Sequence, residues 1–191
     1  MEKVARNDSL IRVVLTGSES TGKTVLAHQL AEHYGAELAP EFVREFALQK
    51  EGAIDFADTE QIAFGQVALE NRHATRAAGL MIQDTDLLST VVYCNHYFGQ
   101  CVEWIQKAAR DRKPDLYLLL EIDVPWVRDE VRDRENRREE MQQLFRNAVT
   151  ESGSSFVVIH GSWDERAELA RKAIDDARAR GITRKPSSPG H

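Results

Sequence analysis

The chain has 191 residues, of which 42% are hydrophobic and 29% are charged, as in ordinary globular domains. Its net charge of −6 argues against a nucleic-acid partner, and no apolar run is long enough to span a membrane. We expect one domain over residues 1–182 and a disordered tail at 183–191. The N-terminus lacks the apolar stretch of a signal peptide, so a cytoplasmic location is predicted.

Strand-like and helix-like segments alternate along the chain, which predicts an α/β fold with helices flanking a parallel sheet. Five segments have the apolar or β-branched composition of buried strands, namely 10–16, 36–39, 80–83, 116–122 and 156–160. The predicted sheet therefore has five strands.

Helical spacing of apolar residues separates these strands. Asp58 with Gln61 predicts the start of one helix, and Ser162 with Glu165 predicts a capping box for the last one. The apolar faces are expected at Val25, Leu26, Leu30 and Ala31; at Ile62, Ala63, Val67 and Leu69; at Met141, Leu144, Phe145, Ala148 and Val149; and at Ala167, Ala170, Ile174 and Ala177.

The run from Gly17 to Thr24 fits the phosphate-binding pattern Gly-x-x-x-x-Gly-Lys-[Ser/Thr] and lies between a predicted strand and a predicted helix. The glycines let the backbone N–H groups approach phosphate oxygens, and the helix N-terminus attracts the same anion. Lys23 can reach the β- and γ-phosphates, and Thr24 can bind Mg²⁺. A plain glycine turn rarely matches this pattern by chance. The predicted ATP-binding residues are Gly17, Ser18, Glu19, Ser20, Thr21, Gly22, Lys23, Thr24 and Val25.

Two acids follow the third predicted strand. Asp84 is expected beside Thr24, where a carboxylate can bind the metal and accept a proton from an attacking hydroxyl. Asp86 precedes Leu87 and is also a candidate helix N-cap, so both roles stay open for this pair.

Glu41 and Arg44 follow the second predicted strand, where residues face the ligand crevice of an α/β sheet. Glu41 can bind a substrate hydroxyl or act as a base, and Arg44 can neutralise a phosphate. The alternative is an exposed helix start with an acid in its first turn.

An arginine-rich segment follows the fourth predicted strand. Asp123 and Pro125 predict a helix start, and the segment is either a solvated face or a lid whose arginines approach the transferring phosphate. The strongest lid candidates are Arg132 and Arg134, with Arg137 or Arg138 as further options.

Three aromatic residues have two interpretations each. Trp163, after the fifth strand, either borders adenine or attaches the last helix to the core, with the core role favoured. Tyr93 and Tyr97 line an acceptor pocket or belong to an aromatic core.

Cys94 and Cys101 lack metal-ligand spacing and are expected to be ordinary thiols without a disulfide or zinc.

In this order the motifs resemble the ribosylnicotinamide kinase domain of NadR-type proteins, within the wider AAA-like P-loop ATPase and kinase group. The resemblance runs from about Leu10 to Ile174. It is carried by Gly-x-Glu-Ser-x-Gly-Lys-Thr, Glu-Phe-Val-Arg-Glu-Phe, Ile-Ala-Phe-Gly-Gln, Asp-Thr-Asp, Tyr-Phe-Gly, Asp-Leu-Tyr-Leu-Leu-Leu and Val-Pro-Trp-Val-Arg-Asp-Glu-Val-Arg. It implies a P-loop kinase fold and ATP-dependent phosphorylation of the 5′-hydroxyl of nicotinamide riboside.

The chain departs from the family pattern at Trp126–Arg132. Arg128 replaces an acid and Glu130 replaces a glycine at the entrance of the expected lid. Fuller family members add adenylyltransferase and DNA-binding domains; neither is expected here, because few residues precede the first strand.

The sequence thus predicts a P-loop kinase that uses ATP and Mg²⁺ to phosphorylate a small-molecule nucleoside. A regulatory ATPase acting through a protein partner is the alternative, and the acidic charge disfavours a nucleic-acid end kinase. No guanine-binding Asn-Lys-x-Asp run is present. The catalytic candidates are Lys23, Asp84, Glu41, Arg132 and Arg134; the substrate-binding candidates are Glu41, Arg44, Asp86 and Tyr97; the metal ligands are Thr24 and Asp84.

Overall fold

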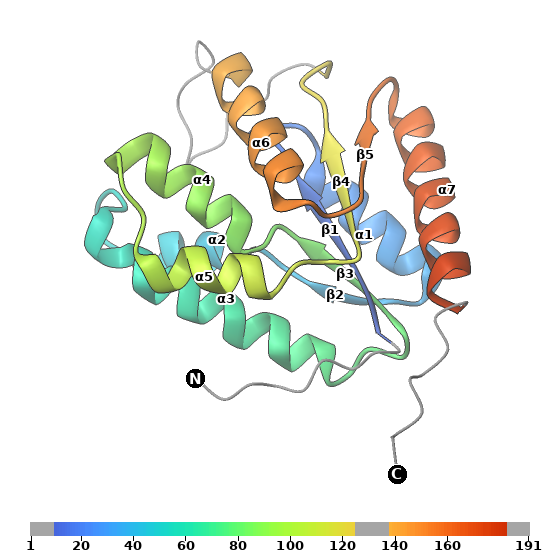
Figure 1. Cartoon of the computed structure of the whole chain (residues 1–191), viewed down its shortest axis with the longest axis horizontal. Coiled ribbons are helices and arrows are strands. Elements are labelled where there is room, and N and C mark those ends of the chain that lie inside the picture. The colour runs from blue at the N-terminus through green and yellow to red at the C-terminus, as the bar shows by residue number, and fades with distance from the viewer. Residues whose placement is uncertain (1–9, 125–137, 183–191) are drawn as a thin grey trace.

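The computed structural model describes residues 10–124 and 138–182, and the side chains of all of these except 181 and 182. Its centre is one parallel sheet with the strand order β2-β3-β1-β4-β5 (Figure 1). The strands are β1 (Ile11–Thr16), β2 (Glu37–Ala39), β3 (Leu80–Asp84), β4 (Leu116–Leu120) and β5 (Phe156–Ile159). The prediction of a five-stranded parallel sheet is confirmed.

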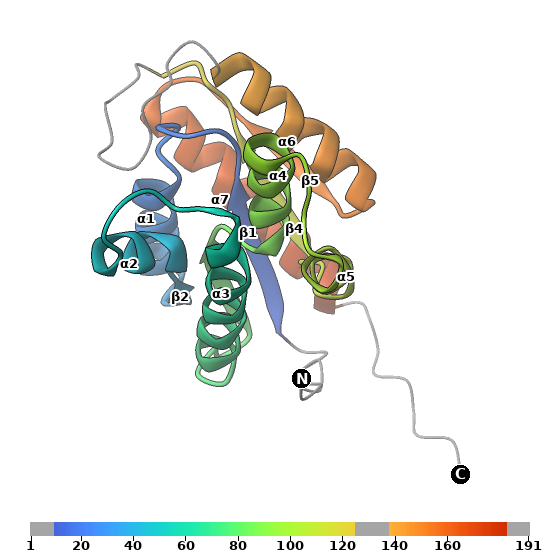
Figure 2. The same cartoon turned by 90° about the vertical axis from the view of Figure 1, so that its left-hand side faces the viewer.

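Helices cover both faces of the sheet (Figures 1 and 2). Helices α1 and α7 pack together on one face, and α3, α4 and α6 cover the other, with α2 against α3 and α5 against α4. The helices are α1 (Lys23–Tyr34), α2 (Phe42–Gln49), the 3-10 helix η1 (Phe56–Asp58), α3 (Thr59–Ala74), α4 (Leu87–Phe98), α5 (Glu103–Asp111), α6 (Arg138–Ser152) and α7 (Trp163–Ile182). None of these described helices is long and apolar enough to cross a membrane.

The central strand explains why the strands could be predicted. Residue Val13 of β1 pairs with Ile82 of β3 and with Leu116 of β4. Val13 and Leu15 are buried under α1 and α7, whereas Val14 is buried on the opposite face. Because both faces are covered, the strands are nearly continuous apolar runs.

The sheet order also places the functional site. The chain leaves β1 for β2 on one side of the sheet and leaves β3 for β4 on the other, so the connections diverge at the carboxyl ends of the neighbouring strands β1 and β3. In open α/β sheets ligands bind in the crevice at such a divergence. The segments that follow β1, β2 and β3 all begin at this edge.

Two helix predictions are wrong in detail. α3 does begin directly after Asp58, but the Asp58 carboxylate makes no cap bond to α3. It closes a capping box one turn earlier, at η1, where Asp55 accepts from Ala57 N–H and Asp58 accepts from Asp55 N–H, both at 2.8 Å. Val25 is not on the buried face of α1, because its side chain is 57% exposed and Ala27 is buried instead. The capping box of Ser162 and Glu165 at the start of α7 is confirmed.

Candidate active site

The phosphate loop connects β1 to α1, and α1 begins at Lys23 within the loop. The first N–H groups of the helix therefore point into the loop, as anion binding requires. Gly22 has a left-handed φ of 85° and lies under the indole of Trp163. A Cβ atom at Gly22 would lie 2.4 Å from the Trp163 ring, so only glycine fits there.

Lys23 is folded onto the loop that carries it. Its Nζ donates to Gly17 O at 2.9 Å and to Ser18 O at 2.6 Å, and the side chain is buried. The ammonium group is thus held at the concave side of the phosphate loop, where a bound phosphate would meet it.

Side chains of α6 and α7, which are far from the loop in the sequence, form hydrogen bonds with the peptide groups of the loop. The Gln142 carboxamide accepts from Ser18 N–H at 3.0 Å and donates to Leu120 O at 2.9 Å. Arg138 donates to Ser20 O at 3.0 Å, and Arg166 donates to Thr21 O at 2.9 Å. Sequence reasoning missed Gln142 and Arg166 and offered Arg138 only as a lid residue. One available signal was the polar Gln142 in line with the apolar face of α6.

Arg166 is the most buried of these supports. Its guanidinium also donates to Gly161 O and Glu121 O, both at 2.9 Å, and pairs with the Asp123 carboxylate. Burial opposes ionisation of Asp123, but the N–H of Gly161 and the charge of Arg166 together lower its pKa. The helix that Asp123 was expected to start lies outside the described residues; the Asp123 carboxylate accepts from Gly161 N–H, just before α7, at 2.6 Å.

Thr24 and Asp84 meet at the carboxyl edge of the sheet. The Thr24 hydroxyl donates to Asp84 Oδ2 at 2.6 Å, and Asp84 Oδ1 is buried with no partner among the described residues. Burial, with the nearby charge of Glu41, raises the pKa of Asp84. A hydroxyl beside a carboxylate oxygen that lacks a partner is a hard-oxygen donor set, so these residues fit Mg²⁺.

Thr85 separates the two acids that follow β3. Its φ of 76° is unusual for a β-branched residue and turns the chain between Asp84 and Asp86. Asp84 consequently contacts Thr24, whereas Asp86 lies at a separate cavity. The spacing Asp84-x-Asp86 therefore serves two different sites.

Asp86 is both a helix cap and a cavity residue, as the open interpretation allowed. Its Oδ1 accepts from Leu88 N–H at 3.0 Å, and its Oδ2 accepts from Tyr117 Oη–H at 2.6 Å. Burial raises the pKa of Asp86 to about 6, although the bond from Tyr117 acts in the opposite direction. Tyr117, inside the apolar run of β4, was not predicted as a site residue.

Glu41 lies at the same cavity, immediately before α2. Arg44 Nε donates to its Oε2 at 2.8 Å, so these residues form an ion pair across the first turn of α2. Glu41 lines the same cavity as Asp86, and its charge helps to raise the pKa of Asp84, so the acids predicted from two separate segments do lie near one another. The Arg44 side chain is 44% exposed.

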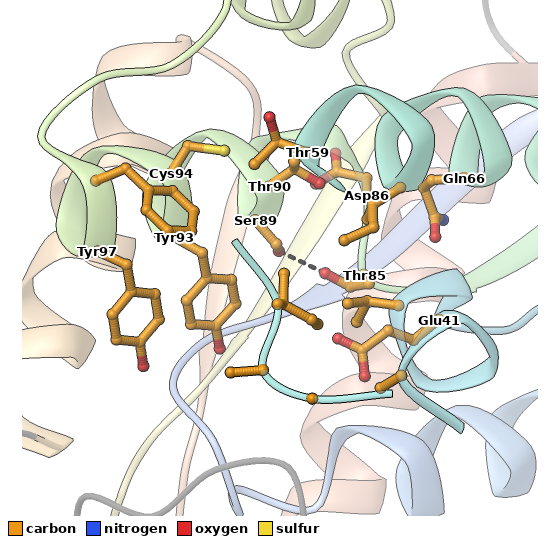
Figure 3. Close-up of a pocket in the computed structure, with 17 residues that line it drawn as sticks. Glu41, Thr59, Gln66, Thr85, Asp86, Ser89, Thr90, Tyr93, Cys94 and Tyr97 are labelled. Atoms are coloured by element: carbon orange, nitrogen blue, oxygen red, sulfur yellow. Dashed lines mark hydrogen bonds between the residues drawn. The ribbon is translucent and has the colours of Figure 1, made fainter. Parts of the chain in front are cut away.

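The cavity has a volume of about 670 Å³, which is within the range for small-molecule sites. Its polar side carries Glu41, Gln66 and Asp86, and its aromatic side carries Tyr93 and Tyr97 of α4 (Figure 3). The two tyrosine rings are nearly parallel, with centroids 6.0 Å apart. Tyr97 thus lines a cavity, and its contact with an acceptor stays a prediction.

Two remaining predictions have different outcomes. Trp163 is not a core residue, because its side chain is 53% exposed and its ring lies on Gly22. Cys94 is a buried free thiol at the cavity, and Cys101 is a partly buried free thiol. The predicted lid residues Arg132, Arg134 and Arg137, with the departures at Arg128 and Glu130 and the tail, lie outside the described residues.

Residues 12–166 match the model of the AAA domain family. The chain belongs to this family. It is 29% identical over 177 residues to the trifunctional NAD biosynthesis/regulator protein NadR of Escherichia coli (strain K12), covering 87% of this chain and 43% of that protein. The NadR of Salmonella typhimurium is 28% identical over 151 residues, covering 76% and 37%. The chain thus spans less than half the length of these relatives, and its resemblance to NadR-type domains is confirmed.

Solved structures show the same fold. NadR in complex with NR superposes with a TM-score of 0.77 at 23% identity, covering 95% of this chain and 52% of that one. NadR with NAD and AMP-PNP gives 0.74 at 24% identity with the same coverage. Thymidylate kinase from Ehrlichia chaffeensis gives 0.62 at 15% identity, covering 87% and 97%. The chain therefore has a P-loop kinase-like architecture.

Proposed function

We propose that the protein is a kinase that transfers the γ-phosphoryl group of ATP to a hydroxyl group of a small nucleoside. The observation that carries this proposal is a phosphate loop adjacent to a cavity with acids on one side and stacked tyrosines on the other. A nucleoside has the complementary parts: a sugar with hydroxyl groups for the carboxylates, and a flat base for the aromatic rings.

The loop residues are proposed to bind the donor. Lys23 would exchange its bonds to Gly17 O and Ser18 O for phosphate oxygens, which places its charge where negative charge develops. Thr24 and Asp84 would hold Mg²⁺, which neutralises charge on the β- and γ-phosphates when it is bound. Trp163 would border the adenine, and Arg132 and Arg134 are proposed to approach the γ-phosphate.

The cavity residues are proposed to bind and activate the acceptor. The acceptor oxygen forms a bond to the γ-phosphorus, the bond to the β–γ bridging oxygen breaks, and ADP leaves. The hydroxyl proton passes to a carboxylate, for which Asp84 and Glu41 are the candidates. Asp86 would grip the sugar, Arg44 would hold Glu41, and Tyr97 would cover the base.

Nicotinamide riboside is the proposed acceptor, or a nucleoside of similar shape. The support is the NadR resemblance and the cavity, whose acids suit the positive charge of a nicotinamide ring as well as sugar hydroxyls. NadR has been solved in complex with NR and with AMP-PNP.

The decisive experiment is an ADP-release assay with ATP and Mg²⁺ over a panel of nucleosides that includes nicotinamide riboside. We expect ADP release that depends on one acceptor, together with the phosphorylated product by mass spectrometry. ADP release at one rate with and without every acceptor would reject the kinase and favour a regulatory ATPase.

A further inference from the structure

The segment Ile62–Gln66 is part of the sequence resemblance, and so far it has entered the site only through Gln66, which lines the cavity. In the structure it lies in α3, where α3 meets the start of α2. Gln66 Oε1 accepts from Phe42 N–H at 2.9 Å, and a Cβ atom at Gly65 would lie 2.1 Å from the Phe42 ring. Gly65 thus lets the first residue of α2 sit directly on α3.

The other end of the Gln66 carboxamide is fixed as well. Its Nε2 donates to Glu70 Oε1 at 3.3 Å, and Gln66 and Glu70 are only 3% and 1% exposed. Glu70 is in turn bound by Arg12 at 3.1 Å and by Arg112 at 2.8 Å. Because the carboxylate can only accept, the amide nitrogen must face Glu70 and the amide oxygen must face Phe42.

This arrangement affects Glu41, the residue before α2. Ser, Thr, Asp or Asn at such a position commonly accepts from the second or third N–H group of the helix. The Glu41 carboxylate makes no such cap bond, and the first N–H group of α2, that of Phe42, is bound by Gln66. The Glu41 carboxylate is turned into the cavity, on the same wall as Gln66 and Asp86 (Figure 3).

We propose that Gln66, with Gly65, is a positioning residue that caps α2 from α3 and thereby holds the Glu41 carboxylate at the acceptor cavity. The anchor is the buried Glu70 with Arg12 and Arg112, which ties the start of α2 to β1 and to the end of α5. The catalytic meaning of this inference rests on the proposed kinase function, whereas the cap itself does not.

The first test is Gln66→Met, which keeps the length of the side chain and removes both hydrogen bonds. We expect kcat/KM for the acceptor to fall by about tenfold, because the unbonded Phe42 N–H lets the start of α2, and with it the Glu41 carboxylate, shift. KM for ATP should change less than about twofold. Amide exchange in a peptide that covers 42–49 should become faster. The matched control is Gln83→Met, a buried glutamine that binds the same Arg12 but not Phe42.

If Gln66 had only a structural role, both variants would lower the melting temperature and would have the same kcat/KM for the acceptor. That result would overturn the proposal. Unchanged amide exchange at 42–49 in Gln66→Met would also overturn it. If wild-type protein shows no acceptor-dependent turnover, the kinase function fails, and the exchange experiment alone decides whether Gln66 caps α2.

A second variant guards against misfolding of Gln66→Met. Gly65→Ala inserts a methyl group against the Phe42 ring and should reduce kcat/KM for the acceptor with Gln66 intact. The double variant Gly65→Ala/Phe42→Leu removes the clash and should recover at least part of the lost kcat/KM. If kcat/KM for the acceptor does not fall in Gly65→Ala, or does not recover in the double variant, the proposed contact is contradicted.

Discussion

The phosphate loop and the cavity proposed to bind the acceptor are adjacent but are held by different means. The loop offers main-chain N–H groups, and buried side chains such as Gln142 and Arg166 support its peptide groups from behind. The cavity is lined by side chains of α2, α3 and α4 and by Glu41 and Asp86, which directly precede α2 and α4. Shape is therefore the critical property of the loop, and charge and protonation are the critical properties of the cavity.

The largest expected effect is at the loop. Lys23→Ala removes the one loop side chain that can carry positive charge to the phosphates, and we expect kcat to fall by about a thousand-fold. Lys172→Ala, an exposed lysine of α7, is the control and should leave kcat unchanged. Appreciable remaining turnover in the Lys23 variant would contradict the catalytic role.

The support behind the loop should matter almost as much as the loop itself. Arg166→Met removes bonds to three backbone carbonyls and the ion pair with Asp123, so we expect the free energy of unfolding to fall by about 3 kcal/mol. Nucleotide affinity should weaken with it, as measured by titration calorimetry. Arg178→Met, on the same helix but packed on Tyr34, should leave affinity unchanged.

The buried Asp86 at the cavity should make the free energy of unfolding depend on pH. Because the pKa of Asp86 rises from 3.8 to about 6 on folding, the native state holds a proton between those values that the unfolded state has lost. The free energy of unfolding therefore falls as pH rises through this window, by about 3 kcal/mol from this group. Asp86→Asn lacks this slope.

Urea unfolding of wild type and Asp86→Asn at several pH values isolates that slope, since other groups titrate alike in both. The stability of the variant relative to wild type should increase from pH 4 to pH 7. If the difference in stability between the variant and wild type is the same at every pH, folding does not raise the pKa of Asp86.

The smallest effect is expected at Tyr117. Tyr117→Phe removes the hydroxyl that stabilises ionised Asp86, so the pKa of Asp86 should rise by about half a unit and stability should fall by about 1 kcal/mol. The acid limb of the acceptor kcat/KM profile should move to higher pH. Tyr34→Phe, whose hydroxyl binds Asp175, is the matched control, and a profile equal to wild type would argue against the Asp86 contact.

The loop was predictable because its information is local. The eight residues from Gly17 to Thr24 are contiguous, and the strands are apolar runs because the sheet is covered on both faces. The pairing of Asp84 with Thr24 was predictable because, in the P-loop fold that the loop motif indicates, an acid at the end of this strand lies beside the hydroxyl residue of the loop.

The supports were not predictable because their partners are distant in sequence. Gln142 meets Ser18, and Arg166 meets Thr21, across more than a hundred residues. Trp163 was misjudged for a similar reason: an indole that follows a buried strand usually packs inward, whereas here Gly22 offers it a flat site at the surface.

The position of Trp163 also provides an intrinsic fluorescence signal close to the phosphate loop. An indole chromophore that is half exposed and rests on the glycine of the phosphate cradle changes its surroundings whenever that cradle is filled. Of the other two tryptophans, Trp104 is stacked on Phe64 in another part of the molecule, and Trp126 lies outside the described residues. Occupancy of the loop should thus be visible in the intrinsic fluorescence of the unlabelled chain.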